Sequence, residues 1–158
     1  MERAYYKSPV GTLKIVCENE EIISLKIVKN INNDNDETAF IQKVKAQLDE
    51  YFDGKRKIFD IRINPKGTDF QKLVWNELKN IPYGKTKSYS YIAEKIGRSG
   101  SQRAVGSACS KNPVMIIIPC HRVISKKGNL SGYAYGADNK RYLIELEHRA
   151  IWMGAVLK

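Results

Sequence analysis

The chain has 158 residues, 42% of them hydrophobic, which suits one large domain or two small ones with a buried core. Its formal net charge of +10 arises entirely in residues 63–158, which hold 16 Lys/Arg and 6 Asp/Glu, because residues 1–62 hold 11 of each sign. A one-sided positive field favours a polyanion such as nucleic acid, although a basic face kept for solubility is the alternative.

The apolar pattern and the cysteines set expectations about compartment. No apolar run reaches the roughly 20 residues that a membrane helix needs, and residues 1–6 lack the apolar core of a signal peptide. The three cysteines, Cys17, Cys109 and Cys120, show no CxxC spacing, which argues against a disulfide framework and a zinc site. We therefore expect no membrane contact and a reducing compartment, cytoplasmic in a prokaryote or nuclear in a eukaryote.

Residues 1–64 are predicted to form a small α/β domain that begins with strands. Ser8-Pro9-Val10-Gly11 is a turn signal, and the alternation of apolar and other residues over 13–17 predicts a strand. The β-branched residues of 21–28 predict a second strand, and the Asn-rich stretch 30–36 predicts a loop.

A helix is expected to follow this loop. Apolar residues recur at helical spacing: Phe40, Val44, Leu48 and Tyr51. Gly54 can end this helix, residues 58–63 are predicted to form a final strand, and Asn64-Pro65-Lys66-Gly67 indicates a boundary. No chemistry is evident in this part of the sequence.

Residues 65–158 are predicted to be mainly helical. Thr68 or Asp69 can cap a first helix that ends at Pro82-Tyr83-Gly84. Its apolar face is expected to hold Phe70, Leu73, Val74 and Ile81. A short second helix is predicted over residues 90–96, with Gly97 as its stop.

A third helix is predicted from Ser101, as its cap, through residue 110. Its inward face would hold Val105, Ala108 and Cys109. Two short helices joined by a Gly-containing turn, in the basic part, are typical of a helix-turn-helix, although packed helices with such a turn occur in many folds.

The chemistry of the chain is concentrated around one thiol. Residues 115–118 form an apolar run, predicted to be a buried strand or extended segment, which leads into Pro119-Cys120-His121-Arg122-Val123. Proline fixes the backbone just before the thiol. A lone buried cysteine is usually a small hydrophobe, but the charges of His121 and Arg122 nearby favour a reactive thiolate. Adjacent residues need not bring their side chains together, so both interpretations stay open.

Asn112-Pro113, the apolar run and Pro-Cys-His-Arg-Val together resemble the active-site signature of the O6-alkylguanine-DNA alkyltransferases, also called methylated-DNA–protein-cysteine methyltransferases. Four further stretches are similar and stand in the family's order: residues 84–93 with Ser88-Tyr89, Arg103-Ala104-Val105-Gly106, Ser131-Gly132-Tyr133, and the helix ending in Glu147. The likeness covers about residues 68–148. The first part resembles the family in its element order, including Ser8-Pro9-Val10-Gly11-Thr12-Leu13.

This resemblance implies an α+β fold of two domains. Residues 1–64 would form a ribonuclease-H-like α/β domain, and residues 65–158 a mostly helical, winged helix-turn-helix-like domain. The implied function is DNA repair by a direct, irreversible and stoichiometric transfer. A methyl or other alkyl group of O6-alkylguanine, and also of O4-alkylthymine, would pass from DNA to Cys120. The implied protein is a single-turnover enzyme and a monomer that acts on double-stranded DNA without a cofactor or metal.

The resemblance also assigns the residues that activate the thiol. His121 would act through a bound water as the base that helps to form the thiolate, and Glu147 would hold and polarise His121. Asn112 would brace the active-site turn by hydrogen bonds. From the residues alone, Glu147 could equally be the exposed end of a charged helix.

The remaining assignments concern the target base. Tyr89 would donate its hydroxyl hydrogen to guanine N3, Ser131 would lie near guanine O6, and the carbonyls of Cys120 and Val123 would accept from the guanine amino group. Arg103 would fill the base stack after the nucleotide is flipped out, and Ser88 would be a further DNA contact. Without the resemblance, Tyr89 could be packing and Arg103 a phosphate contact.

Two departures and three alternatives accompany this interpretation. Some family members bind zinc in the first domain, but here it has Cys17 and no histidine, so no zinc is expected. Leu130 stands where many relatives carry a polar or aromatic residue, which affects the expected width of the pocket for the alkyl group.

The alternative functions are a non-enzymatic helix-turn-helix regulator, a lesion-binding alkyltransferase-like protein, and a Cys-His hydrolase that uses His148.

Overall fold

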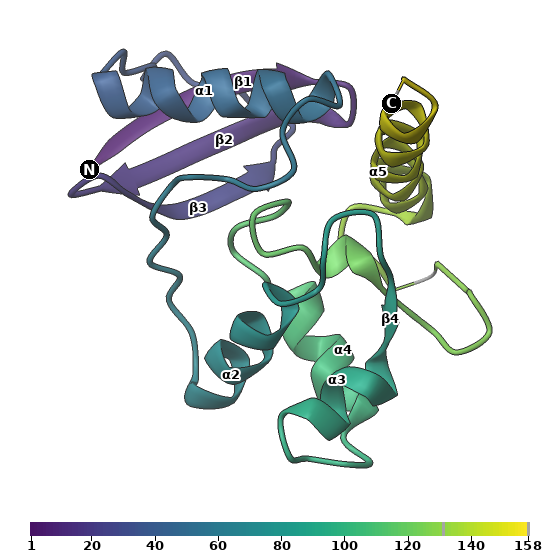
Figure 1. Cartoon of the computed structure of the whole chain (residues 1–158). Coiled ribbons are helices and arrows are strands. Elements are labelled where there is room, and N and C mark those ends of the chain that lie inside the picture. Colours follow the sequence, from purple (N-terminus) through teal and green to yellow (C-terminus); the bar gives the residue numbers. More distant parts are fainter. Residues whose placement is uncertain (131, 158) are drawn as a thin grey trace.

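The computed structural model describes residues 1–130 and 132–157, with side chains through residue 154. The elements, in chain order, are β1 (Glu2–Ser8), β2 (Gly11–Glu18), β3 (Glu21–Ile27), α1 (Ala39–Phe52), α2 (Asp69–Leu78), β4 (Lys87–Ser88), α3 (Tyr89–Lys95), α4 (Gln102–Ser110), the 3-10 helix η1 (Cys120–Arg122), β5 (Val123–Ile124) and α5 (Ala137–Leu157). A small sheet domain precedes a helical domain (Figure 1), so the α+β class expected from the sequence is confirmed.

The first domain is an antiparallel sheet in the order β1-β2-β3, with α1 lying across one face (Figure 1). The alternation in β2 has the expected effect, because Leu13, Ile15 and Cys17 are fully buried. Thr38 caps α1 by accepting the Ile41 N–H at 3.3 Å.

The predicted final strand over residues 58–63 is wrong. Within the described residues, this segment makes one bridge, Ile22 to Ile63. Earlier in this segment, the Asp60 N–H donates to Gln47 Oε1 at 2.9 Å, so it bonds a side chain of α1 and not the backbone of a neighbouring strand. Ile58 is 80% exposed and does not join the core.

The helices of the second domain begin close to where their caps predict. Thr68 and Gln71 form a reciprocal capping box at the start of α2, and the Trp75 indole N–H ties α2 to the Ala108 carbonyl at 2.9 Å. The predicted face of α2 is partly wrong: the helix ends at Leu78, before the buried Ile81, and Leu73 is 40% exposed.

The pair α3–α4 has the predicted inward face, since Val105, Ala108 and Cys109 are buried. Ser101, however, does not cap α4 with its side chain, because its hydroxyl donates to the Arg98 carbonyl at 2.5 Å. Gly97 has the left-handed φ of 75° expected of a helix stop.

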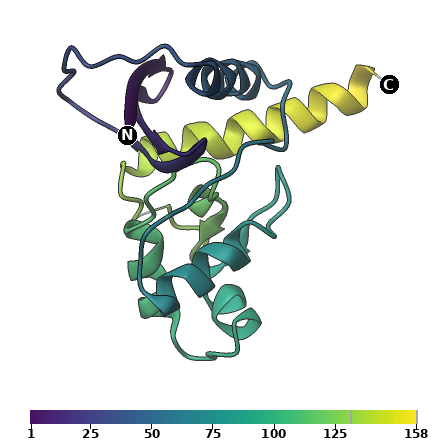
Figure 2. The same ribbon diagram turned by 90° about the vertical axis from the view of Figure 1, so that its left-hand side faces the viewer.

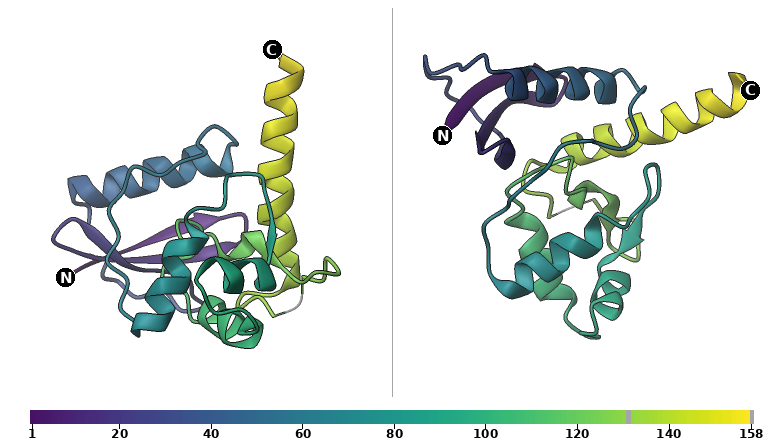
Figure 3. Two further views of the ribbon diagram at one scale, coloured as in Figure 1. Left: turned by 60° about the horizontal axis from the view of Figure 1, so that its bottom comes forward. Right: turned by 60° about the vertical axis from the view of Figure 1, so that its left-hand side comes forward.

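The apolar run before the thiol is buried as predicted, but it is not a strand. Val114 makes an isolated bridge to Leu25 of β3, and the chain then turns tightly, with Ile116 at a φ of 73°. β5, which directly follows η1, pairs in parallel with β4. α5 passes the junction of the two domains beside α1, and its C-terminal end projects away from the helical domain (Figures 2 and 3). No described helix has the length and apolar character needed to cross a membrane.

Candidate active site

The thiol of Cys120 lies in a buried turn that Asn112 holds together. Cys120 opens η1 directly after Pro119 and is 4% exposed. The amide nitrogen of Asn112 donates to the Ile118 carbonyl at 2.7 Å and to Cys120 Sγ at 3.1 Å. Its amide oxygen accepts the Val114 N–H at 2.9 Å, so one side chain closes the turn and contacts the sulfur.

His121 and Glu147 meet in the interior although they are 26 positions apart. His121 Nε2 lies 2.6 Å from Glu147 Oε2, and Glu147 is 1% exposed, so it is not an exposed helix end. The other carboxylate oxygen, Oε1, accepts the Gly84 N–H at 3.1 Å. Gly84 has a left-handed φ of 77°, a conformation that favours glycine.

Arg122 neutralises Glu147. Its Nε donates to Oε1 at 2.8 Å and its Nη2 to Oε2 at 3.1 Å, while Nη1 donates to the Ile81 carbonyl at 2.8 Å. The Arg122 guanidinium is therefore committed to the carboxylate, and the cation that lowers the pKa of the Cys120 thiol is Lys140.

The protonation states of His121 and Glu147 follow from their surroundings. Burial alone would raise the pKa of Glu147, but the charges and hydrogen bonds of His121 and Arg122 outweigh burial and hold that pKa far below its usual range. Burial lowers the pKa of His121 despite the attraction of Glu147. A neutral imidazole that donates from Nε2 to the carboxylate keeps its lone pair on Nδ1. Among the described residues, this buried Nδ1 has no hydrogen-bond partner.

The thiol itself is held mainly in its neutral form. Burial raises the pKa of Cys120, whereas the hydrogen bond from Asn112 and the charge of Lys140 act in the opposite direction. Lys140 is 1% exposed, and its Nζ lies 3.5 Å from the Tyr89 hydroxyl and 5.8 Å from the Tyr133 ring centroid. Lys140 thus brings a buried positive charge to the side of the site that holds Tyr89.

Sequence reasoning missed Lys140 and also Tyr51, whose hydroxyl donates to Glu147 Oε2 at 2.7 Å. The spacing of Lys140, Leu143 and Glu147 could have revealed Lys140, because it places all three on one helix face. In the structure all three are buried. Tyr51 gave no such signal, since a tyrosine on an apolar helix face is normally packing.

The residues expected to meet the target base lie at the start of α3 and around β5. The Tyr89 ring packs near Gly106 of α4, and burial with the nearby thiols raises the pKa of Tyr89 to about 12. The Ser88 hydroxyl caps α3 by accepting the Tyr91 N–H at 3.0 Å. Val123 is buried in β5 beside η1.

Two further expectations concern DNA contact. Arg103 is exposed in the first turn of α4, away from the helix face that is buried. Ser131, the residue expected near guanine O6, lies outside the described residues.

Two family models match almost the whole chain. Residues 1–65 match the 6-O-methylguanine DNA methyltransferase ribonuclease-like domain, and residues 69–149 match the 6-O-methylguanine DNA methyltransferase DNA binding domain. A methylated-DNA–protein-cysteine methyltransferase of Methanosarcina acetivorans is 42% identical over 155 residues, covering 93% of this chain and 98% of the relative. One of Mycobacterium tuberculosis is 42% identical over 146 residues, covering 89% and 88%.

Solved structures are similar over the same extent. The crystal structure of the M. tuberculosis O6-methylguanine methyltransferase has a TM-score of 0.87 at 39% identity and covers 94% of this chain and 93% of its own. The structure of M. tuberculosis OGT in complex with DNA has a TM-score of 0.88 at 40% identity, covering 95% and 94%.

Proposed function

This chain belongs to the 6-O-methylguanine DNA methyltransferase family, and we propose that Cys120 is the cysteine that accepts the methyl group. Its function is DNA repair by methyl transfer from methylated DNA to a protein cysteine, and it binds DNA. The observation that carries Cys120 is the 3.1 Å hydrogen bond from Asn112 to its sulfur, in a turn that leads directly into the His121–Glu147 pair. Cys17, in the first domain, faces a carboxylate instead of an amide donor: its sulfur lies 3.7 Å from Glu2 Oε1, and burial and the Glu2 charge raise its pKa to about 11.

In the proposed relay, one atom, His121 Nδ1, receives the proton of the Cys120 thiol. The Cys120 proton passes through one water to His121 Nδ1, whose lone pair is free because Nε2 donates to Glu147. The thiolate then attacks the alkyl carbon, a carbon–sulfur bond forms, and the carbon–O6 bond breaks with its electrons on guanine. Tyr89 donates a proton to guanine N3, and the proton held by His121 restores the Tyr89 hydroxyl through solvent. Overall, the alkyl group replaces the thiol hydrogen and guanine gains that hydrogen.

The proposed substrate is O6-alkylguanine, and secondarily O4-alkylthymine, in double-stranded DNA, bound by a monomer. The nucleotide is flipped out and Arg103 fills the stack, a role supported by its exposure on α4. The carbonyls of Cys120 and Val123, and Ser131, remain the proposed contacts of the base, with Ser88 a proposed contact of DNA.

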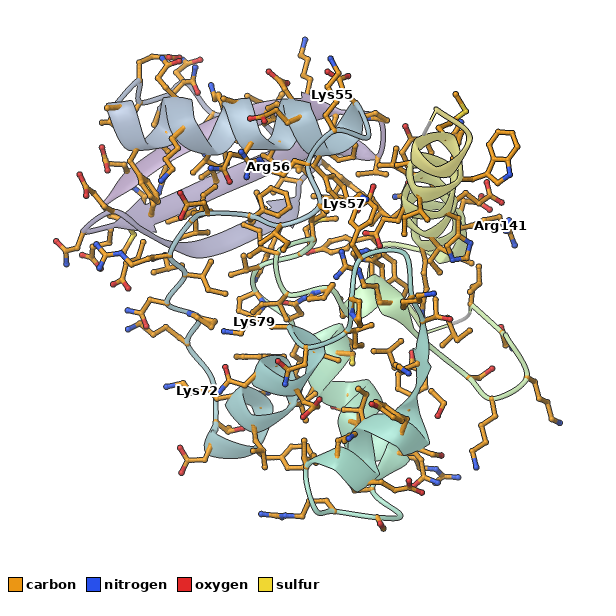
Figure 4. All side chains as sticks on the ribbon, in the orientation of Figure 1. Lys55, Arg56, Lys57, Lys72, Lys79 and Arg141 are labelled. Atoms are coloured by element: carbon orange, nitrogen blue, oxygen red, sulfur yellow. The ribbon has the colours of Figure 1, made fainter. Side chains whose placement is uncertain are left out.

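Most of the positive charge lies off α4, the second helix of the proposed helix-turn-helix and the one that carries Arg103. Arg103 is the only Lys or Arg of α4. Lys72 lies on α2 and Lys79 directly follows that helix as its C-cap, whereas Arg141 lies on α5 at the other side of the molecule in this view (Figure 4). A single cation on α4 and a basic excess carried by the rest of residues 63–158 support binding dominated by phosphates, with little reading of base sequence.

We place the domain boundary after residue 64, because the Asn64 N–H makes the last bond to the sheet, at 2.8 Å, before Thr68 caps α2. Cys17, Cys109 and Cys120 are all free thiols, which supports a reducing compartment, cytoplasmic or nuclear.

The test of this function is the intact mass of the protein after mixing with duplex DNA that contains O6-methylguanine. A single turnover predicts that each chain gains one methyl group in place of a hydrogen and then stops. An unchanged mass would indicate a DNA-binding regulator, and continued release of product from an unmodified chain would indicate a hydrolase.

A further inference from the structure

One side chain of the first domain contacts the relay. Tyr51 lies in the last turn of α1, is fully buried, and donates its hydroxyl hydrogen to Glu147 Oε2 at 2.7 Å across 96 positions of sequence. The same oxygen lies 2.6 Å from His121 Nε2 and accepts Arg122 Nη2 at 3.1 Å. A residue of the sheet domain therefore shares one carboxylate oxygen with the base of the relay.

We propose that Tyr51 is a positioning residue for methyl transfer, acting through Glu147 to limit how strongly that carboxylate holds the proton-bearing side of His121. The proposal rests on the relay described above. A neutral donor on Oε2 takes up part of the negative charge of the oxygen, and it also fixes the direction in which the oxygen faces. His121 is then aligned by the carboxylate without being held as an imidazolium before the thiol gives up its proton.

The hydroxyl and the ring of Tyr51 make different contacts, so their roles can be tested separately. The ring centroid lies 5.2 Å from that of Phe52, 5.6 Å from that of Phe59 and 6.3 Å from that of Tyr83, so the ring packs against aromatic side chains of both domains. Burial and the Glu147 charge raise the pKa of Tyr51 well above its usual value, so its hydroxyl keeps its proton and remains a donor. A phenylalanine would preserve this packing and remove the donor alone.

The charged and titratable groups around the pair come from several elements: Tyr51 from α1, Tyr83 from the segment before β4, Arg122 from η1, and Lys140 from α5. Arg122 and Lys140 both disfavour a charged imidazole, whereas Glu147 favours it. Removing the Tyr51 hydroxyl strengthens the pull of Glu147 on His121. The expected change is therefore a higher pKa of His121 in Tyr51→Phe.

The first measurement is the pH titration of the His121 ring by NMR in the whole chain. The chain has two histidines, and the exposed His148 serves as the internal reference. We expect the His121 midpoint in Tyr51→Phe to rise by at least about 0.5 pH unit, roughly threefold in proton affinity. Because this readout needs no transfer, it tests Tyr51 even if the parent accepts no alkyl group, an outcome that would count against the proposed function instead.

The second measurement is the single-turnover rate with the free base O6-benzylguanine as a function of pH. We expect the acid limb of the Tyr51→Phe profile to move to higher pH, with a several-fold slower rate on that limb and less than about a twofold change above it. Tyr6→Phe is the matched control, because the Tyr6 hydroxyl bonds the Asp49 carboxylate at 2.6 Å in the same domain and the ring also contacts Phe52. An unshifted His121 midpoint, or an equal loss of rate at every pH, would overturn the proposal.

Discussion

Arg122 and Glu147 form a two-point ion pair in the interior, with Nε–Oε1 at 2.8 Å and Nη2–Oε2 at 3.1 Å. Both side chains are largely withdrawn from solvent, at 9% and 1% exposure. Two parallel hydrogen bonds fix the plane of the carboxylate, and this plane sets the direction from which Glu147 meets His121.

Replacing Arg122 should therefore destabilise the protein strongly. Arg122→Met leaves the Glu147 charge buried without its cation, and the expected loss is about 3–5 kcal/mol in the free energy of unfolding. Lys43→Met is the control, because its pair with Asp60 at 3.6 Å is largely exposed and should contribute at most about 1 kcal/mol. Urea denaturation at neutral pH measures both, and similar losses in the two variants would contradict the buried-pair account.

The parts of this arrangement that are local in sequence could be predicted. Thr68 and Gly97 mark helix ends through bonds and dihedral angles within a few residues, and the stretch around Cys120 carries its own signature. The strand predicted over 58–63 failed because a β-branched run does not show whether a partner strand is available. Tyr51 was missed for a related reason, since its partner lies 96 positions away.

Glu147 should matter for the rate of transfer more than for DNA binding. Glu147→Gln removes the negative charge that stabilises protonated His121 while the side chain keeps its size, so alkyl transfer should slow at least about tenfold, corresponding to about 1.4 kcal/mol. Single-turnover rates at saturating alkylated duplex, beside the dissociation constant for the same duplex, provide the measurement. Equal rates for the variant and the parent would show that Glu147 is not part of a relay.

Stability should decrease in acid in two steps. Burial lowers the pKa of His121 in the folded protein. The contribution of neutral His121 to the free energy of unfolding is therefore present above the pKa of an unfolded histidine, about 6.5, and is lost as the pH falls below it. Burial raises the pKa of Glu147, but His121 and Arg122 together lower it by more. The contribution of the Glu147 carboxylate to the free energy of unfolding is therefore present above the pKa of an unfolded glutamate, about 4.3, and is lost at lower pH. Denaturation at a series of pH values should show both steps in the parent, and the lower step should be much smaller in Glu147→Gln. A parent of constant stability from neutral pH to about pH 4 would contradict these protonation states.

Arg103 separates flipping from chemistry. If it fills the vacated stack, Arg103→Ala loses part of the compensation for an extrusion that costs a few kcal/mol, and a loss of about 1.4 kcal/mol slows repair of duplex DNA tenfold. O6-benzylguanine needs no extrusion, so its reaction rate should be nearly unchanged. A parent-like rate on saturating duplex would leave Arg103 as a phosphate contact, and an equal loss on both substrates would indicate a damaged pocket.

The acceptor can be located directly by mapping the methyl group on peptides of the protein after reaction with duplex DNA containing O6-methylguanine. The buried turn that joins Asn112, Cys120 and His121 predicts methylation of the Cys120 peptide alone. Cys120→Ser should bind the duplex and carry no methyl group, whereas Cys17→Ser and Cys109→Ser should react at nearly the parent rate. A methyl group found on Cys17 or Cys109 would contradict the assignment of Cys120 as the acceptor.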